Sequence, residues 1–340
     1  MTAGRHRGRT PWLPSTLPEP RGPLSSAVLA ALRGEVLKVP PLPTASSAYD
    51  EDLQLALYML YELHYQGYAE VPDEMEWDTQ LLALRNALED RFLAVLRTDM
   101  PTDEGETAEQ ALNELQLEPV DGDECGVSHF LRDTGTIEQF REYAAMRSLY
   151  HLKEADPHAW VIPRLHGRAK AGMVAVEFDE FGAGRAEDIH AQLFADLMTD
   201  LDLDTAYGHY VDATPTEAVA TVNLMSLLGL HRALRGALVG HFASVEVASS
   251  PASRRLAEAL RRVGAGPAAV RFYAEHVEAD AVHEQVVRHE VVAGLLESEP
   301  QLEADVVFGI HATAHLESRL AARLLGAWRS GATALRTRTH

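Results

Sequence analysis

Residues 273–289 read YAEHVEADAVHEQVVRH, and this stretch decides how the rest of the chain is interpreted. It places His276, Asp280 and His283 at positions i, i+4 and i+7, which on a helix lie within an arc of about 60°. Two imidazoles and a carboxylate on one face suit a divalent first-row metal. The face continues with apolar residues such as Val287, so we expect it to point inward. Burying such a cluster without a ligand would be costly, which favours a metal site over a structural polar cluster.

The composition indicates a helical protein. The chain has 340 residues, 46% of them hydrophobic, and apolar residues recur mostly every three or four positions, which predicts an all-α fold. The formal net charge of −21 argues against nucleic acid as a partner, because phosphate binding requires a basic surface. The single cysteine, Cys125, excludes an intramolecular disulfide and a cysteine-based metal site.

The N-terminal region has no apolar segment typical of an export signal, and the chain has no apolar run long enough for a membrane span. We therefore expect a cytoplasmic protein.

Three regions follow from changes in composition along the chain. Residues 1–24 are rich in Arg and Pro and are expected to be disordered. Residues 25–127 form a predicted N-terminal helical extension that ends in an acidic linker over 102–127. Residues 128–340 form the main helical domain, in which the Ser249–Ser253 stretch with its proline is expected to end one helix before the next. The extension contains no residues that look catalytic, and Glu62 and His64 are expected to have core or surface roles.

One helix with three donors leaves a metal under-coordinated, so further ligands are expected on neighbouring helices. Glu177 and Glu180 lie near the end of a predicted helix, and His190 follows beyond a glycine-rich break. Glu246 lies among apolar residues, and Glu154 follows another predicted helix. Each residue alone is weak evidence for a metal ligand, because a glutamate on a helix is usually solvated. Together with the three donors above, they would suit two metals with oxygen and nitrogen ligands inside a helical bundle.

The order Glu180, His190, Glu246 and then His276-x3-Asp280-x2-His283 resembles the haem-oxygenase-like diiron oxidases and oxygenases, also called the iron-containing redox enzyme family. The resemblance covers roughly residues 135–335. The His-x3-Asp-x2-His motif is its specific part. Some members carry a further upstream glutamate, and the matching position here is Glu154; Glu177 is an alternative to Glu180.

The resemblance implies a seven-helix bundle that holds two irons, Fe(II) or Fe(III), and activates O2 as a co-substrate. It implies an oxidase or oxygenase acting on a small amine, amino-acid-like or fatty-acid-like molecule, with a separate electron donor. The ligand types alone permit manganese as well as iron. The N-terminal extension and the large helical surfaces are compatible with a homodimer.

Other occupants of related folds fit less well. A haem oxygenase uses one proximal histidine, and a thiaminase-like enzyme needs a cysteine within the bundle, whereas Cys125 precedes it. A ferritin-like bundle carries Glu-x-x-His on two helices, which this chain does not match cleanly. A non-catalytic helical protein that binds metal or a partner remains the alternative from another class.

Several further residues have two open interpretations. Phe272 and Tyr273 belong either to a pocket or, more simply, to the core. The basic residues before Glu177 and the histidine pair on the last helix are expected on the surface or beside the bundle, with substrate or ligand-supporting roles as the alternative. These residues are Arg164, Arg168, Lys170, His311 and His315.

Overall fold

The computed structural model describes residues 15–42, 48–100, 105–116 and 126–336, and this part of the chain contains helices and no strands. The predicted all-α class is therefore confirmed. The N-terminal helices are α1 (Pro23–Leu32), α2 (Glu51–Glu62), α3 (Thr79–Asp99), α4 (Ala108–Glu114) and α5 (Val127–Asp133). The main bundle contains α6 (Ile137–His151), α7 (Asp156–Ala159), α8 (Gly167–Glu180), α9 (His190–Asp200), α10 (Thr216–Leu230), α11 (Arg235–Val263), α12 (Pro267–Val286), a π-helical turn (Val287–Val292), α13 (Ala293–Ser298) and α14 (Glu303–Arg329).

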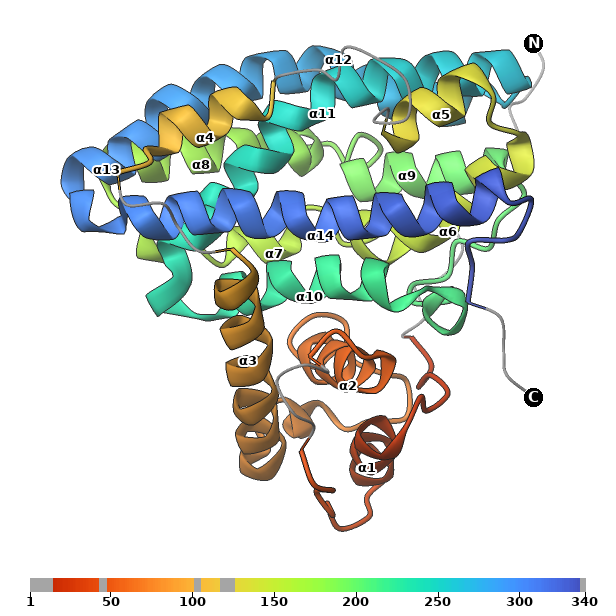
Figure 1. Ribbon diagram of the computed structural model, residues 1–340, viewed down its shortest axis with the longest axis vertical. Helices are drawn as coiled ribbons and strands as arrows, with labels where there is room; N and C mark the ends of the chain where they lie inside the picture. Colours follow the sequence, from red (N-terminus) through yellow and green to blue (C-terminus); the bar gives the residue numbers. More distant parts are fainter. Residues whose placement is uncertain (1–14, 43–47, 101–104, 117–125, 337–340) are drawn as a thin grey trace.

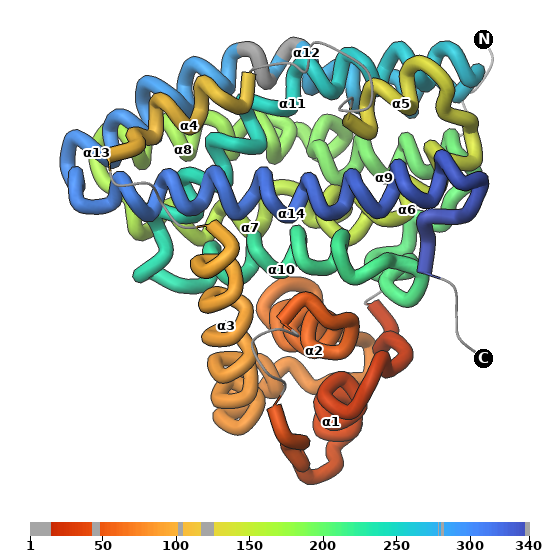
Figure 2. The backbone as a smooth tube through the Cα atoms, in the orientation of Figure 1, coloured from red at the N-terminus to blue at the C-terminus, as the bar shows by residue number. Residues whose placement is uncertain are grey.

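The bundle is elongated, and α1, α2 and α3 lie together on one side of it, next to α10 (Figure 1). The trace in Figure 2 follows α14 along the length of the bundle, between α11 on one side and α10 on the other. Helix α12 packs against both α11 and α9. No helix in the described ranges is long and apolar enough to cross a bilayer.

Local sequence explains where several helices begin and end. Thr136 caps α6, and the Gln139 side chain accepts a hydrogen bond from the Thr136 backbone N–H in return, which forms a capping box. The Asp78 carboxylate accepts hydrogen bonds from two backbone N–H groups in the first turn of α3. Gly264 ends α11 in the left-handed conformation, with φ of 74°.

The predicted helix break at Ser249–Ser253 is wrong, because α11, which is 29 residues long, continues through this stretch. Pro251 lies inside this helix. A proline removes one backbone hydrogen bond and usually bends or ends a helix. Here the residues on both sides, such as Val247 and Leu256, are buried against neighbouring helices, and this packing outweighs the local preference.

A continuous apolar core joins the N-terminal helices to the bundle. It runs from α1 and α2 through α10 and α11 to α14, with Val28, Leu57, Leu227, Leu238 and Ile310 among its buried members. A second apolar cluster lies where α6, α9, α11, α12 and the end of α14 meet. Because α2 packs directly on α10, the N-terminal helices and the metal-ligand candidates are parts of the same packed structure.

Polar contacts cross the same boundary. The Asn223 amide on α10 donates to the backbone and side-chain oxygens of Gln54 on α2, both at 2.8 Å. Of the stretch expected to be disordered, residues 1–14 lie outside the described ranges, whereas Ser15 forms an isolated bridge with Tyr68. The predicted linker contains α4, which packs against α14, while Cys125 lies outside the described residues.

Candidate metal centre

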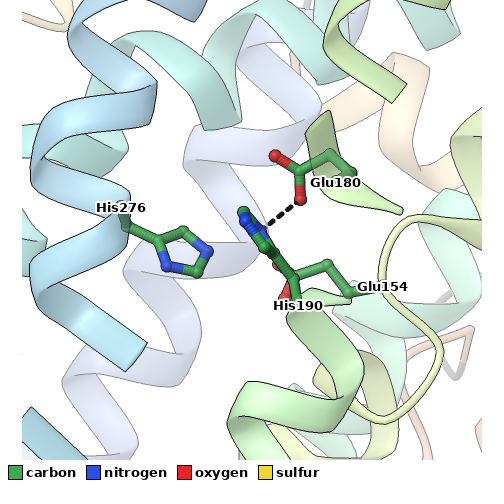
Figure 3. A group of neighbouring side chains, drawn as sticks. All are labelled: Glu154, Glu180, His190 and His276. Atoms are coloured by element: carbon green, nitrogen blue, oxygen red, sulfur yellow. Dashed lines mark ion pairs between the residues drawn. The ribbon is translucent and has the colours of Figure 1, made fainter. Parts of the chain in front are cut away.

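Four of the predicted ligands meet inside the bundle. Glu154, Glu180, His190 and His276 are all buried, and each offers a ligand atom within 4.8 Å of the others. They come from the turn after α6, the end of α8, the start of α9 and the middle of α12 (Figure 3). His190 Nδ1 lies 2.6 Å from Glu180 Oε2. We call these four residues cluster one.

Three predicted ligands form a second group beside the first. Glu180, Glu246 and His283 are buried, and their ligand atoms also lie within 4.8 Å of one another. His283 Nδ1 lies 3.2 Å from Glu246 Oε2 and 3.6 Å from Glu180 Oε1. We call this group cluster two. Glu180 belongs to both clusters, so its two oxygens can face two neighbouring cations.

The backbone between α8 and α9 brings Glu180 and His190 together. Gly182 has a φ of 73°, and a Cβ at this position would come within 2.6 Å of the Ile189 nitrogen. Ala183 follows in the left-handed region with a φ of 51°. Only a residue without a side chain fits this turn at Gly182, and the turn directs the end of α8 and the start of α9 to the same point.

The histidines of α12 are oriented as metal ligands usually are. His276 Nδ1 donates a hydrogen bond to the carbonyl of Phe272 at 2.7 Å, which leaves Nε2 buried without a hydrogen-bond partner. His283 Nε2 lies 3.3 Å from Asp179 Oδ2, so Nδ1 is the nitrogen that faces cluster two. A carbonyl or carboxylate on one ring nitrogen fixes the tautomer and presents the other nitrogen to a cation.

The carboxylates concentrate negative charge in a buried space. Glu177 is buried, neither of its oxygens has a hydrogen-bond partner, and burial together with Glu180 and Glu246 raises its pKa to about 9. Burial opposes ionisation of Glu154 too, but the imidazoles led by His151 overcome it and lower its pKa to about 2. A buried carboxylate without a partner, such as Glu177, is costly, and a divalent cation would stabilise its ionised form, so the donor set fits a metal.

Comparison with known families agrees with this arrangement. The sequence model of one family, described as iron-containing redox enzymes, matches residues 141–318, just over half of the chain. The chain belongs to the iron-containing redox enzyme family. No curated protein matches the chain. The matched residues include every member of both clusters, and the predicted family and haem-oxygenase-like bundle are confirmed.

The enclosed space beside the two clusters is small. A cavity of about 20 Å³ lies between the clusters and is lined by Tyr150, Glu154, His158, Glu246 and His276, among others. This is room for about one water-sized species. In this conformation the protein therefore encloses its ligand candidates and leaves no space there for a larger molecule.

Sequence reasoning missed a pair of buried histidines beside the cavity. The Thr313 hydroxyl donates to the Gly309 carbonyl at 2.7 Å, so it accepts from His241 Nδ1 at 2.8 Å. His241 Nε2 then accepts from His158 Nε2 at 3.1 Å, which leaves the lone pair of His158 Nδ1 buried and without a partner. Burial and the neighbouring imidazole hold the pKa of His158 well below its usual value. His158 and His241 are 83 residues apart, so only their proximity to Glu154 and Glu246 in the sequence could have drawn attention to them.

The supporting residues Asp179 and His151 were missed as well. Asp179 precedes Glu180 and is half exposed, while His151 Nδ1 lies 3.0 Å from Glu154 Oε2. Neither has a periodicity that distinguishes it from an ordinary helical residue. The backbone of Asp280 lies in α12, but its side chain lies outside the described part of the structure.

The remaining predicted residues lie away from both clusters or within the core. Phe272 and Tyr273 are buried in the second apolar cluster, and the Phe272 ring centroid lies 4.4 Å from that of His276. His311 pairs with Glu106 and His315 lies near Asp99, so both face the N-terminal helices.

The basic residues have structural partners. Arg164 donates to the carbonyls of Gly229 and Leu230 at the end of α10, and Arg168 pairs with Glu290 and Glu297 on the surface. Lys170 is half buried.

Proposed function

We propose that the protein is a non-haem diiron oxidoreductase that activates O2, with cluster one and cluster two each holding one iron. The observation that carries the proposal is the position of Glu180, whose carboxylate belongs to both groups of donors. A carboxylate shared by two neighbouring sites is suited to two cations about 3.5–4 Å apart. We extend the ligand set to Asp280, which follows His276 by one helical turn, and to Glu177, which is buried beside Glu180.

The donor types favour a reactive metal over a structural one. A structural zinc site usually has four cysteine or histidine ligands in a closed tetrahedron. Cluster one offers two carboxylates and two imidazoles, and cluster two offers two carboxylates and one imidazole. Iron held by such donors would supply one-electron redox chemistry and reaction with O2.

The protein's own residues would provide binding, orientation and proton control. The Phe272 carbonyl and Asp179 would fix the ring tautomers of His276 and His283, so that the other nitrogen of each ring faces its cluster. Glu177 holds a proton at neutral pH in the metal-free protein and would release it when a cation binds. The His158 lone pair would accept a hydrogen bond from a water-sized species in the cavity, and the surrounding burial would exclude further water.

The substrate that we propose is a small amine, an amino-acid-like molecule or a fatty-acid-like molecule, with electrons from a separate donor. The enclosed cavity accepts about one water-sized species, so such a substrate would require movement of the residues around the clusters.

The test is anaerobic Fe(II) loading, followed by metal analysis and rapid mixing with O2 while visible absorbance is recorded. We expect about two irons per chain and a transient absorption band after mixing. Glu138→Gln, which changes an exposed carboxylate paired with Arg141, is the matched control and should load like the parent. A folded protein that takes up no iron would contradict the proposal and favour a non-catalytic helical protein.

A further inference from the structure

A buried ion pair connects the N-terminal helices to the residue next to Glu154. The Lys153 ammonium pairs with Oε1 of Glu62, and the two side chains are 0% and 1% exposed. The other oxygen of Glu62 accepts a hydrogen bond from the Tyr207 hydroxyl at 2.5 Å. Glu62 is the last residue of α2, and Lys153 lies in the turn after α6, so the pair joins segments 91 residues apart.

Two aromatic rings lie close to the ammonium group. Lys153 Nζ lies 4.0 Å from the ring centroid of Tyr65 and 5.6 Å from that of Tyr58. The Tyr65 hydroxyl is within 3.1 Å of Ser226 Oγ on α10. A carboxylate and two aromatic rings therefore hold the lysine head group, and all three belong to residues 58–65.

Stability alone does not account for this pair. Desolvation of two charges offsets much of their attraction, and in other proteins apolar residues of similar volume often stabilise the fold as well or better. A buried pair with specific partners does fix geometry. Here it fixes the backbone at Lys153, whose N–H donates to the Tyr150 carbonyl at 2.8 Å and whose carbonyl accepts from the Asp156 N–H at 2.9 Å.

Glu154 follows directly in this turn and has different neighbours. Its Oε2 lies 3.0 Å from His151 Nδ1, and it belongs to cluster one with Glu180, His190 and His276. Successive side chains of one short turn thus contact the N-terminal helices and the metal-ligand candidates. A displacement of Lys153 would carry Glu154 with it.

We propose that Glu62 is a positioning residue for Glu154, acting through Lys153, so that the N-terminal helices complete cluster one. The inference rests on the proposed function insofar as Glu154 holds a metal. It assigns a role to the extension, residues 25–127, beyond covering the bundle. Cluster two, which does not include Glu154, should be independent of this contact.

The test compares Glu62→Gln with Glu89→Gln. Glu89 is also a buried carboxylate of the N-terminal helices and also reaches the bundle, through His231 at 2.9 Å, but it has no contact with Lys153. Each protein is titrated anaerobically with Co(II) and followed by visible absorbance. For Glu62→Gln we expect one of two binding steps to weaken by about tenfold to a hundredfold, the range typical of residues that orient ligands. Glu89→Gln should retain both steps.

A second readout needs no metal. His151 Nδ1 contacts the Glu154 carboxylate, so the chemical shifts of its ring nitrogens depend on where Glu154 lies. These shifts are recorded by NMR in metal-free proteins labelled with ¹⁵N-histidine. The His151 resonances should shift in Glu62→Gln and stay in place in Glu89→Gln. Tyr207→Phe, which removes only the hydroxyl bonded to Glu62, should change them in the same direction by a smaller amount and provides a variant that keeps the ion pair.

The outcomes separate the two proposals. A parent protein that binds no Co(II) contradicts the metal centre, and the His151 resonances still test the positioning role. Parent-like Co(II) binding and unchanged His151 resonances in both Glu62→Gln and Tyr207→Phe would overturn the positioning role and leave the metal centre intact. An equal loss in Glu62→Gln and Glu89→Gln would also overturn it, because both variants would then act through general destabilisation.

Discussion

Replacement of Glu177 by Gln tests whether the centre is built to hold a cation. Folding raises the pKa of Glu177 from an ordinary 4.5 to about 9, through burial and the neighbouring carboxylates. Between these values the folded protein holds a proton that the unfolded chain has lost. The contribution of Glu177 to the unfolding free energy of the metal-free protein is therefore complete below pH 4.5 and declines as the pH rises towards 9.

The size of this loss in unfolding free energy follows from the raised pKa of Glu177. The range from pH 4.5 to pH 7.5 spans three pH units, each worth about 1.4 kcal/mol, so the loss is about 4 kcal/mol. Glutamine cannot ionise, so Glu177→Gln lacks this loss. The unfolding free energy of the variant minus that of the parent should therefore rise by about 4 kcal/mol between pH 4.5 and pH 7.5, whatever its value at pH 4.5.

The assay is urea unfolding of the metal-free parent and variant at matched pH values. Other titrating groups are common to both proteins and cancel in the difference. A difference that is the same at pH 5 and pH 8 would show that folding does not raise the pKa of Glu177. In the parent, Co(II) affinity between pH 7 and 8.5 should rise by about tenfold per pH unit as the proton is displaced, and this slope should flatten in the variant.

Three further predictions follow from the same geometry. Glu180→Gln should lose both metals, whereas His283→Ala should lose only the metal of cluster two; metal analysis checks both, with far-UV circular dichroism as the control for helicity. Gly182→Ala should destabilise the protein by about 1–3 kcal/mol and reduce metal content, because φ is 73° and the new Cβ meets the Ile189 nitrogen; thermal unfolding and metal analysis measure it. Burial lowers the pKa of His241 to about 4. Its contribution to the unfolding free energy is therefore complete above pH 6.5 and falls by about 3 kcal/mol as the pH drops to 4. His241→Phe should lose that slope in acid unfolding experiments, and an unchanged slope would contradict the assignment.

The sequence predicts the helical elements of the centre better than its connections. The spacing of His276 and His283 predicts α12 and its inward face, and both side chains are buried there. Spacing alone did not separate Glu177 from Glu180, because both are buried at the end of α8. Their difference depends on the turn at Gly182, where the backbone conformation brings Glu180 to His190.

Long-range polar contacts were beyond the reach of periodicity. The Glu62–Lys153 pair depends on how α2 docks, and the His158–His241 pair depends on how α7 meets α11. Local propensity also misjudged α11, since Pro251 predicts an end to the helix while packing on both sides keeps it continuous. In each case tertiary contacts determine a feature that neighbouring residues do not encode.

Anomalous X-ray scattering at the iron edge, from crystals loaded anaerobically with Fe(II), shows whether two cations share Glu180. We predict two anomalous peaks per chain about 3.5–4 Å apart, one bounded by Glu154, His190 and His276 and the other by Glu246 and His283, with the Glu180 carboxylate between them. One peak, or peaks away from Glu180, in a fully loaded crystal would contradict a carboxylate shared by two cations.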